Sequence, residues 1–230
     1  VLQQLSMNST RVIGPTLAGS FIAVSFIGTG GVYFMTTAGF FIAMATMLRL
    51  PPGNPTPRET QVSPLADMAD GLRYVAGRPS ILLLILTSFA VIMVGFPYQS
   101  FLPSVAKDVY GVGSGGLGLL QSAGAVGAVV ATVFVATYAG SKKAWVAQPL
   151  LAIGFGLALV VLGLAPTFPI GLLAMLAVGA LASGFQGMNN SLTMSTTDSA
   201  YHGRVQSISM LSWSMFGLAA LPIGILADHI

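Results

Sequence analysis

The sequence predicts an all-α protein that crosses a lipid bilayer several times. Of its 230 residues, nine are Lys or Arg and six are Asp or Glu, so only 7% are charged, against roughly a quarter in an ordinary soluble domain. The hydrophobic fraction is 54%, and a soluble protein with so few charges would expose an almost continuous apolar surface. Disorder requires low hydrophobicity and high charge, so the composition excludes that class and argues strongly against a soluble enzyme.

The second observation is that the apolar residues gather in seven long runs. Each run is close to the ~20 residues that an α-helix needs to cross ~30 Å of hydrocarbon. Their length and their lack of two-residue alternation exclude transmembrane β-strands. The runs cover residues 12–27, 32–48, 80–102, 115–139, 145–165, 170–197 and 205–227.

Charged and turn-forming residues mark the boundaries of these runs. The first run begins after Arg11 and ends at a glycine-rich turn, and the second run ends at Arg49. The later runs are separated by short segments that contain Lys, Asp, Pro or Gly, namely 103–114, 140–144, 166–169 and 198–204.

The central segment, residues 49–79, predicts an amphipathic helix rather than a membrane span. Prolines within 51–57 prevent a helix at its start, and Ser63-Pro64 is typical of an N-cap followed by the first helical residue. Four apolar residues then recur at helical spacing: Leu65, Met68, Leu72 and Val75. The helix lies either at the inner membrane surface or against the bundle, and it serves as a linker or as a regulatory site.

The distribution of Lys and Arg predicts the orientation in the membrane. With a cytoplasmic N-terminus, the outside segments contain only Lys107. The inside segments contain the other basic residues: Arg11, Arg49, Arg58, Arg73, Arg78, Lys142, Lys143 and Arg204. We therefore expect a multi-pass protein of the plasma membrane (the bacterial inner membrane). The excess of basic residues on one side explains the net charge of +3 without a nucleic-acid partner.

Four groups of residues carry a resemblance to a known family. Gly14-Pro15 with Gly19 forms a Gly-Pro-x-x-x-Gly core. The others are Asp70–Val75 followed by Arg78-Pro79, Phe96-Pro97 followed by Leu102–Ala106, and His202–Ser207. In this order they resemble the enterobactin-exporter and macrolide-efflux-like branch of the major facilitator superfamily. One departure is His202, which stands where the Arg-Gly-Arg-Val-x-Ser motif of that branch has its first arginine.

The resemblance implies two six-helix bundles joined by a long cytoplasmic loop. We expect residues 1–48 to be the last two helices of the N-terminal half-bundle, 49–79 the central loop with its amphipathic helix, and 80–230 five helices of the C-terminal half-bundle. On this interpretation the chain is helices five to eleven. Its partners include the missing N-terminal helices of the same transporter, which would be a monomer when complete.

The activity implied by the resemblance is secondary active export of small molecules such as drugs, macrolides or siderophore-like compounds. Export would proceed by alternating access and be coupled to protons. The alternative is a non-transporting membrane fragment or scaffold.

The first run contains the candidate transport motif: Arg11, Gly14, Pro15 and Gly19. Proline kinks a membrane helix and glycine permits close approach of a neighbouring helix. The resemblance implies a seam that seals the cavity on one side, whereas an ordinary kink with packing glycines is the alternative. Arg11 either pairs with an acidic group in the missing half or extends to lipid phosphates.

The third run contains a candidate hinge, because Gly95 and Pro97 predict a bend near its outer end. Tyr98 and Gln99 follow the bend and are candidates for lining a substrate cavity. The alternative for Tyr98 is a place in the interfacial aromatic belt.

Polar residues within two later runs are further candidates. Gln121 lies mid-run and requires a partner or a water-lined cavity, while Ala123, Gly127 and Ala131 form a small-residue stripe for close packing. In the sixth run, one polar face contains Gln186, Asn190, Thr193 and Thr197, flanked by Asn189. This face either makes interhelical hydrogen bonds or lines a cavity. The resemblance adds Gly203 and Arg204 as a cytoplasmic loop motif.

We expect no metal, cofactor or catalytic chemistry. The chain has no Cys, and His202 and His229 have no ligand pattern around them. It also lacks a phosphate-binding Gly-rich loop and a nucleophile–base pair, so we expect neither ATP coupling in this chain nor an enzyme. No acidic residue lies mid-run, so a proton carrier would lie elsewhere. The expected partners are a small-molecule substrate and the lipid bilayer.

Overall fold

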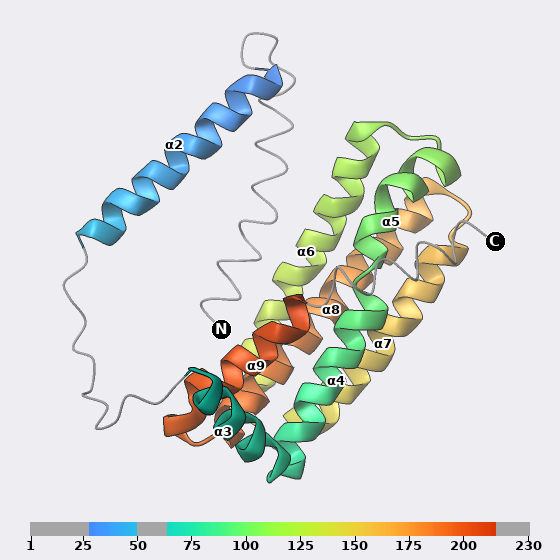
Figure 1. Ribbon diagram of the computed structural model, residues 1–230. Coiled ribbons are helices and arrows are strands. Elements are labelled where there is room, and N and C mark those ends of the chain that lie inside the picture. Colours follow the sequence, from blue (N-terminus) through green and yellow to red (C-terminus); the bar gives the residue numbers. More distant parts are fainter. Residues whose placement is uncertain (1–27, 50–63, 215–230) are drawn as a thin grey trace.

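The computed structural model describes residues 28–49 and 64–214, and within these ranges the chain is helical with short turns. The helices are α2 (Gly28–Leu48), α3 (Pro64–Ala76), α4 (Pro79–Gly95), α5 (Tyr98–Ser104), α6 (Ser114–Tyr138), α7 (Ala144–Leu164), α8 (Phe168–Thr196) and α9 (His202–Ser214). A π-helical turn, Val105–Val109, continues α5, and a 3-10 turn, Ser199–Tyr201, precedes α9. Figure 1 shows α4 to α9 as one bundle, with α2 apart from it.

Four segments in the described part of the chain are long and apolar enough to cross a membrane. They are Pro79–Val109, Ser114–Tyr138, Ala144–Leu164 and Phe168–Thr196. They match four of the predicted runs, and the all-α membrane fold predicted from the sequence is confirmed. The first run and the end of the last one lie outside the described residues.

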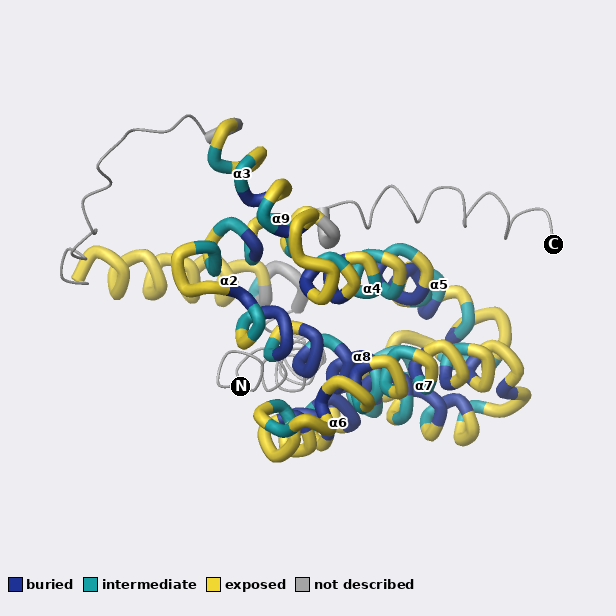
Figure 2. The backbone as a smooth tube through the Cα atoms, turned by 90° about the horizontal axis from the view of Figure 1, so that it is seen from below, coloured by how far each residue is buried: buried dark blue, intermediate teal, exposed yellow. Residues whose placement is uncertain are grey.

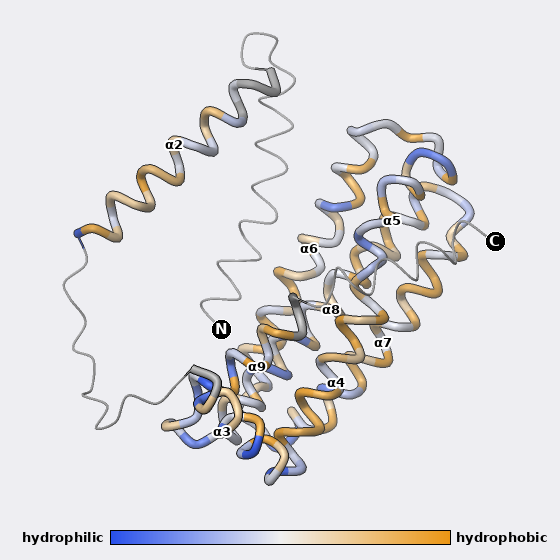
Figure 3. The backbone as a smooth tube through the Cα atoms, viewed as in Figure 1, coloured by the Kyte–Doolittle hydropathy of each residue, from blue (hydrophilic) through white to orange (hydrophobic). Residues whose placement is uncertain are grey.

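The spans alternate in direction, so that their connections fall at two opposite ends of the bundle (Figure 1). The α5–α6 and α7–α8 connections lie at the upper end, and the α6–α7 and α8–α9 connections lie at the lower end together with α3. Figure 3 shows hydrophobic residues along the spans and a concentration of hydrophilic residues around α3.

The first of these spans is broken where the Gly-Phe-Pro sequence predicts a bend. α4 ends at Gly95 and α5 begins at Tyr98, so the break falls at the Gly-Phe-Pro sequence, where Pro97 combines a missing N–H with the neighbouring flexible Gly95. We expected a loop from Pro103, but this is wrong. Pro103 lies inside α5, and the helix continues as a π-turn in which the Tyr110 N–H donates to the Val105 carbonyl. One missing donor does not end a helix whose other backbone groups remain paired.

α8 is the central helix, and it packs against α6 through glycines. A Cβ atom on Gly179 would overlap the backbone carbonyl of Gly124, and one on Gly127 would overlap the backbone of Leu176 and Ala180. Backbone therefore meets backbone along this seam, as the small-residue stripe of α6 predicts. Figure 2 shows α8 as the most continuously buried helix of the bundle.

Candidate functional site

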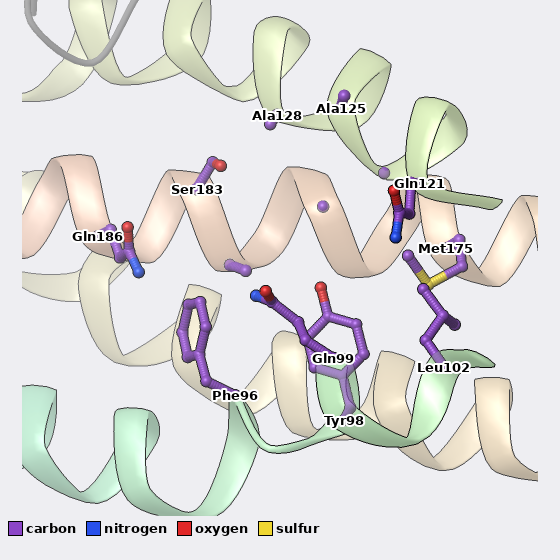
Figure 4. Close-up of a pocket in the computed structure, with 13 residues that line it drawn as sticks. Phe96, Tyr98, Gln99, Leu102, Gln121, Ala125, Ala128, Met175, Ser183 and Gln186 are labelled. Carbon is purple, nitrogen blue, oxygen red and sulfur yellow. The ribbon is translucent and has the colours of Figure 1, made fainter. Parts of the chain in front are cut away.

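A cavity of about 430 Å³ opens between the broken span, α6 and α8. Figure 4 shows the α5, α6 and α8 side chains converging on it from three directions. Its lining combines aromatic, small and amide side chains: Phe96, Tyr98, Gln99, Leu102, Gln121, Gly124, Ala125, Ala128, Met175, Gly179, Ala182, Ser183 and Gln186.

Three glutamines, each from a different helix, supply most of the hydrogen-bonding capacity of this cavity. Gln99 comes from α5, Gln121 from α6 and Gln186 from α8. Among the described residues, the buried Gln186 Nε2 atom has no hydrogen-bond partner. An unpaired buried amide N–H costs about 1–3 kcal/mol, so this position favours an acceptor that could pair with it.

The break in the span is held by an aromatic contact. The Phe96 and Phe155 ring centroids are 5.7 Å apart, and those of Tyr98 and Phe155 are 6.3 Å apart in an edge-on arrangement. Phe155 lies so close to Gly95 that a Cβ atom there would overlap its ring. Gly95 is thus required by the packing of α7 against the break, and the break directs Tyr98 and Gln99 towards the cavity (Figure 4).

The cavity is electrically neutral. Among the described residues that line it there is no Asp, Glu, His, Lys or Arg. Its walls offer amide donors and acceptors, two hydroxyl groups and aromatic faces. Such a lining suits a ligand of mixed polarity that needs hydrogen bonds but no counter-charge.

The polar face predicted on residues 170–197 is divided between several roles. Gln186 lines the cavity, but Asn190 and Thr193 do not. Asn190 is exposed, and the buried Thr193 hydroxyl donates to the Asn189 carbonyl. The interhelical hydrogen bond comes instead from the flanking Asn189, whose side-chain oxygen accepts from Gln148 of α7 at 3.2 Å. Asn190 and Thr193 thus lie outside the lining of this cavity.

The helix-five motif, with Arg11, Gly14, Pro15 and Gly19, lies outside the described residues. Gly203 and Arg204 lie in the first turn of α9 rather than in a loop, because the helix begins at His202. Gly203 is exposed, and no atom lies near the position of its missing Cβ.

Arg204 joins α9 to α3 through two carboxylates. Its guanidinium donates to Asp67 and to Asp70, each at 2.9 Å. Only 24% of the Arg204 side chain and 18% of that of Asp67 are exposed, so this pair is partly shielded from water and is stronger than a surface pair. The hydrogen bond to Asp67 raises the pKa of Arg204, so the guanidinium stays protonated.

A second set of contacts reinforces this junction. The Tyr74 and Tyr201 rings stack with centroids 3.9 Å apart, and the Arg78 guanidinium lies 3.9 Å from the Tyr74 ring centroid. Arg78 also pairs with Asp198 at 2.7 Å, and the Asp198 N–H donates to the Tyr74 hydroxyl. We call the contacts among Asp67, Asp70, Tyr74, Arg78, Asp198, Tyr201 and Arg204 the α3–α9 clasp.

Sequence reasoning missed the clasp. The sequence analysis singles out Arg204 only by resemblance and assigns no partner to the two carboxylates. The partners are more than a hundred residues apart, so no local pattern connects them. The one usable signal was the spacing of Asp67 and Asp70, which places two carboxylates on one helix face.

The bundle of apolar spans around a neutral polar cavity defines a multi-pass membrane protein with an internal cavity. Residues 2–222 match the Major Facilitator Superfamily, and the chain belongs to that family. It is 27% identical over 217 residues to the enterobactin exporter EntS of Shigella boydii serotype 18, and 26% identical over 217 residues to that of Escherichia coli O81. Each alignment covers 90% of this chain and 49% of the relative.

The EntS of Shigella flexneri is 25% identical over 210 residues, which cover 90% of this chain and 48% of the relative. The chain thus spans about half the length of the curated relatives that it matches. No solved structure matches it significantly.

Proposed function

We propose that the chain works in a secondary transporter that exports small molecules of mixed polarity, siderophore-like or drug-like in character. The observation that carries this proposal is the neutral cavity between the broken span, α6 and α8, lined by Gln186, whose Nε2 atom has no hydrogen-bond partner among the described residues. Membership of the Major Facilitator Superfamily and the similarity to enterobactin exporters support export.

The transport mechanism that we propose is alternating access, in which the break at residues 95–98 acts as a hinge. The hinge contacts both the cavity and α7, since Phe96 and Tyr98 line the cavity and pack on Phe155. Movement at this point changes the cavity wall directly. Proton coupling usually employs a carboxylate or histidine, and among the described residues no Asp, Glu or His lines the cavity. We therefore place the proton carrier outside the cavity.

We propose that the lower end of the bundle in Figure 1 faces the cytoplasm of a bacterial cell, with the protein in the inner membrane. Arg78, Lys142, Lys143 and Arg204 lie on helices or turns at that end, and Lys107 lies near the upper end. Such an excess of basic residues is typical of the cytoplasmic side. On this proposal, residues 49–79 form the cytoplasmic connection between the two half-bundles.

The function is tested by measuring the accumulation of a broad panel of labelled small molecules in cells that express the transporter, with and without a protonophore. We expect lower accumulation of at least one compound class, and recovery when the proton gradient is removed. Unchanged accumulation across the panel would contradict export.

The site is tested separately with Gln121→Leu and Gln186→Leu, because each removes a hydrogen-bonding group from the cavity while keeping volume. A lost hydrogen bond of about 1–1.5 kcal/mol corresponds to roughly a five- to tenfold weaker apparent affinity. Asn190→Leu is the matched control, since Asn190 is on the same helix as Gln186 but does not line the cavity. Equal effects of all three variants would contradict the site.

A further inference from the structure

The short helix α3 packs on the bundle mainly with the side that carries its carboxylates, whereas an amphipathic helix usually buries its apolar stripe. Asp67, Asp70 and Tyr74 belong to the α3–α9 clasp, and a Cβ atom on Gly71 would meet Arg204 and Ile208 of α9. Val75 is 3% exposed and joins a small apolar cluster with α4 and α9. The polar side of α3 is therefore its protein-facing side.

The other side of α3 is apolar and is not covered by any described part of the chain. Met68 and Leu72 are 50% and 49% exposed, and Ala69 and Ala76 are exposed between and beyond them. The sequence favoured one continuous stripe that included Val75, but the structure separates Val75 from Met68 and Leu72. The reason is that the two charge-assisted hydrogen bonds from Arg204 to Asp67 and Asp70 determine which side of α3 faces α9. They do so more strongly than burial of one more apolar side chain would.

The charges on α3 are divided between its two faces. Both of its acidic residues are engaged by Arg204 on the protein side. Arg73 is exposed and lies on the uncovered side, next to Leu72. The uncovered face thus combines large apolar side chains with one cation and no acid among its described residues, which complements an apolar layer edged by anionic groups.

The position of α3 indicates which surface covers this face. α3 ends at Ala76, and the membrane-spanning α4 begins at Pro79. Leu83 and Leu86, in the first turns of α4, are 63% and 54% exposed, as lipid-facing residues of a span are expected to be. Figures 1 and 2 show α3 at the edge of the bundle where that span starts. The boundary between lipid and water therefore lies at the level of α3.

We propose that the Met68–Leu72–Arg73 face of α3 is a membrane-surface docking site that inserts into the headgroup region of the surrounding bilayer. The clasp holds the polar side of the helix on α9, and anionic lipid holds the other side through Arg73. The inference goes beyond the proposed function, because it concerns the anchoring of the segment before α4 and does not depend on what is exported.

The absence of Cys from the sequence permits a direct test. A single Cys, introduced as Leu72→Cys, is spin-labelled in the full chain, which is then reconstituted in vesicles of phosphatidylethanolamine and phosphatidylglycerol. Collision rates with oxygen, which partitions into lipid, and with a water-soluble nickel chelate give the depth of the label. Val160→Cys, on an exposed position of α7, provides the lipid reference, and Lys142→Cys, in an exposed turn, provides the water reference.

For the label at position 72, we expect the ratio of the oxygen collision rate to the nickel-chelate collision rate to be several-fold above the ratio at position 142. It should lie below the ratio at position 160. A ratio equal to that at Lys142 would overturn the proposal by placing the face in water. Low collision rates with both reagents would also overturn it, because they would show a protein cover such as another helix of the transporter. If the labelled Leu72→Cys protein cannot be reconstituted in vesicles, the label is placed at Met68→Cys instead.

The lipid charge is tested by repeating the measurement without phosphatidylglycerol. We expect the ratio at Leu72 to fall, and Arg73→Gln to remove the difference between the two lipid mixtures. Lys107→Gln, at the opposite end of the bundle, is the matched control and should leave the difference intact. A difference that survives Arg73→Gln would contradict the role given to Arg73.

Discussion

Replacing Gly179 by Ala tests the packing that forms one wall of the cavity. Gly179 lines the cavity and also lies on the α6–α8 seam. Its missing Cβ would overlap the carbonyl oxygen, the carbonyl carbon and the Cα of Gly124. All of these are backbone atoms of another helix, so no side-chain rotation can make room. The helices must separate, and the new methyl group then spreads the cavity wall.

The expected magnitude follows from two opposing effects. Overpacking a close-packed contact costs typically 1–3 kcal/mol, whereas Ala is better than Gly in a helix by about 0.8–1.0 kcal/mol. The net loss is therefore about 0–2 kcal/mol. Relative to a Gly→Ala change that gains helix propensity without overlap, the loss is the full overpacking cost of about 1–3 kcal/mol. Since 1 kcal/mol lowers the Tm of a chain of this size by roughly 2–4 °C, we expect Gly179→Ala to unfold about 2–12 °C below such a variant.

The assay is thermal unfolding of the purified protein in detergent micelles, followed by loss of a monodisperse size-exclusion peak. Gly156→Ala is the matched control, because Gly156 lies within α7 and has no atom within 4 Å of the position of its Cβ. That variant gains helix propensity without overlap and should unfold at an equal or slightly higher temperature. If Gly179→Ala and Gly156→Ala have the same Tm, α6 and α8 do not pack backbone to backbone as described.

Two further predictions concern hydrogen bonds between helices. Asn189→Leu leaves the buried Gln148 side chain without its partner, and we expect a loss of about 0.6–1.7 kcal/mol, as for hydrogen bonds between membrane helices; Asn190→Leu, at an exposed position, should change the Tm little. Arg204→Gln removes the ion pairs that join α9 to Asp67 and Asp70 of α3, and we expect α3 to become susceptible to limited proteolysis while the spans stay folded. An α3 that remains as resistant as in the unchanged chain would contradict the clasp.

The membrane spans were predictable because their signal is local. In a run of apolar residues long enough to cross the membrane, only an α-helix pairs all backbone hydrogen-bonding groups within the run. Gly95 and Pro97 interrupt such a run, and a bend in the helix accommodates them. The four complete spans and the break after α4 therefore follow from the sequence.

The contacts between distant segments were not predictable in the same way. Helical spacing places Gln186, Asn190 and Thr193 on one face, but it cannot show how much of that face the neighbouring helices cover. α7 approaches α8 closely enough to bury Asn189, while Asn190 remains exposed one residue later. Likewise, the apolar spacing in α3 predicts an amphipathic helix, but only the position of Arg204 on α9 decides which face is buried.

The central claim is that the exported molecule binds in the cavity between the broken span, α6 and α8. The most direct measurement is protection of a single introduced Cys from a methanethiosulfonate reagent by a compound that the efflux assay identifies. Gln121→Cys should react more slowly when this compound is present, because Gln121 lines the cavity. Asn190→Cys, an exposed position outside the cavity, should react at an unchanged rate. Equal rates for Gln121→Cys with and without saturating compound would contradict the claim.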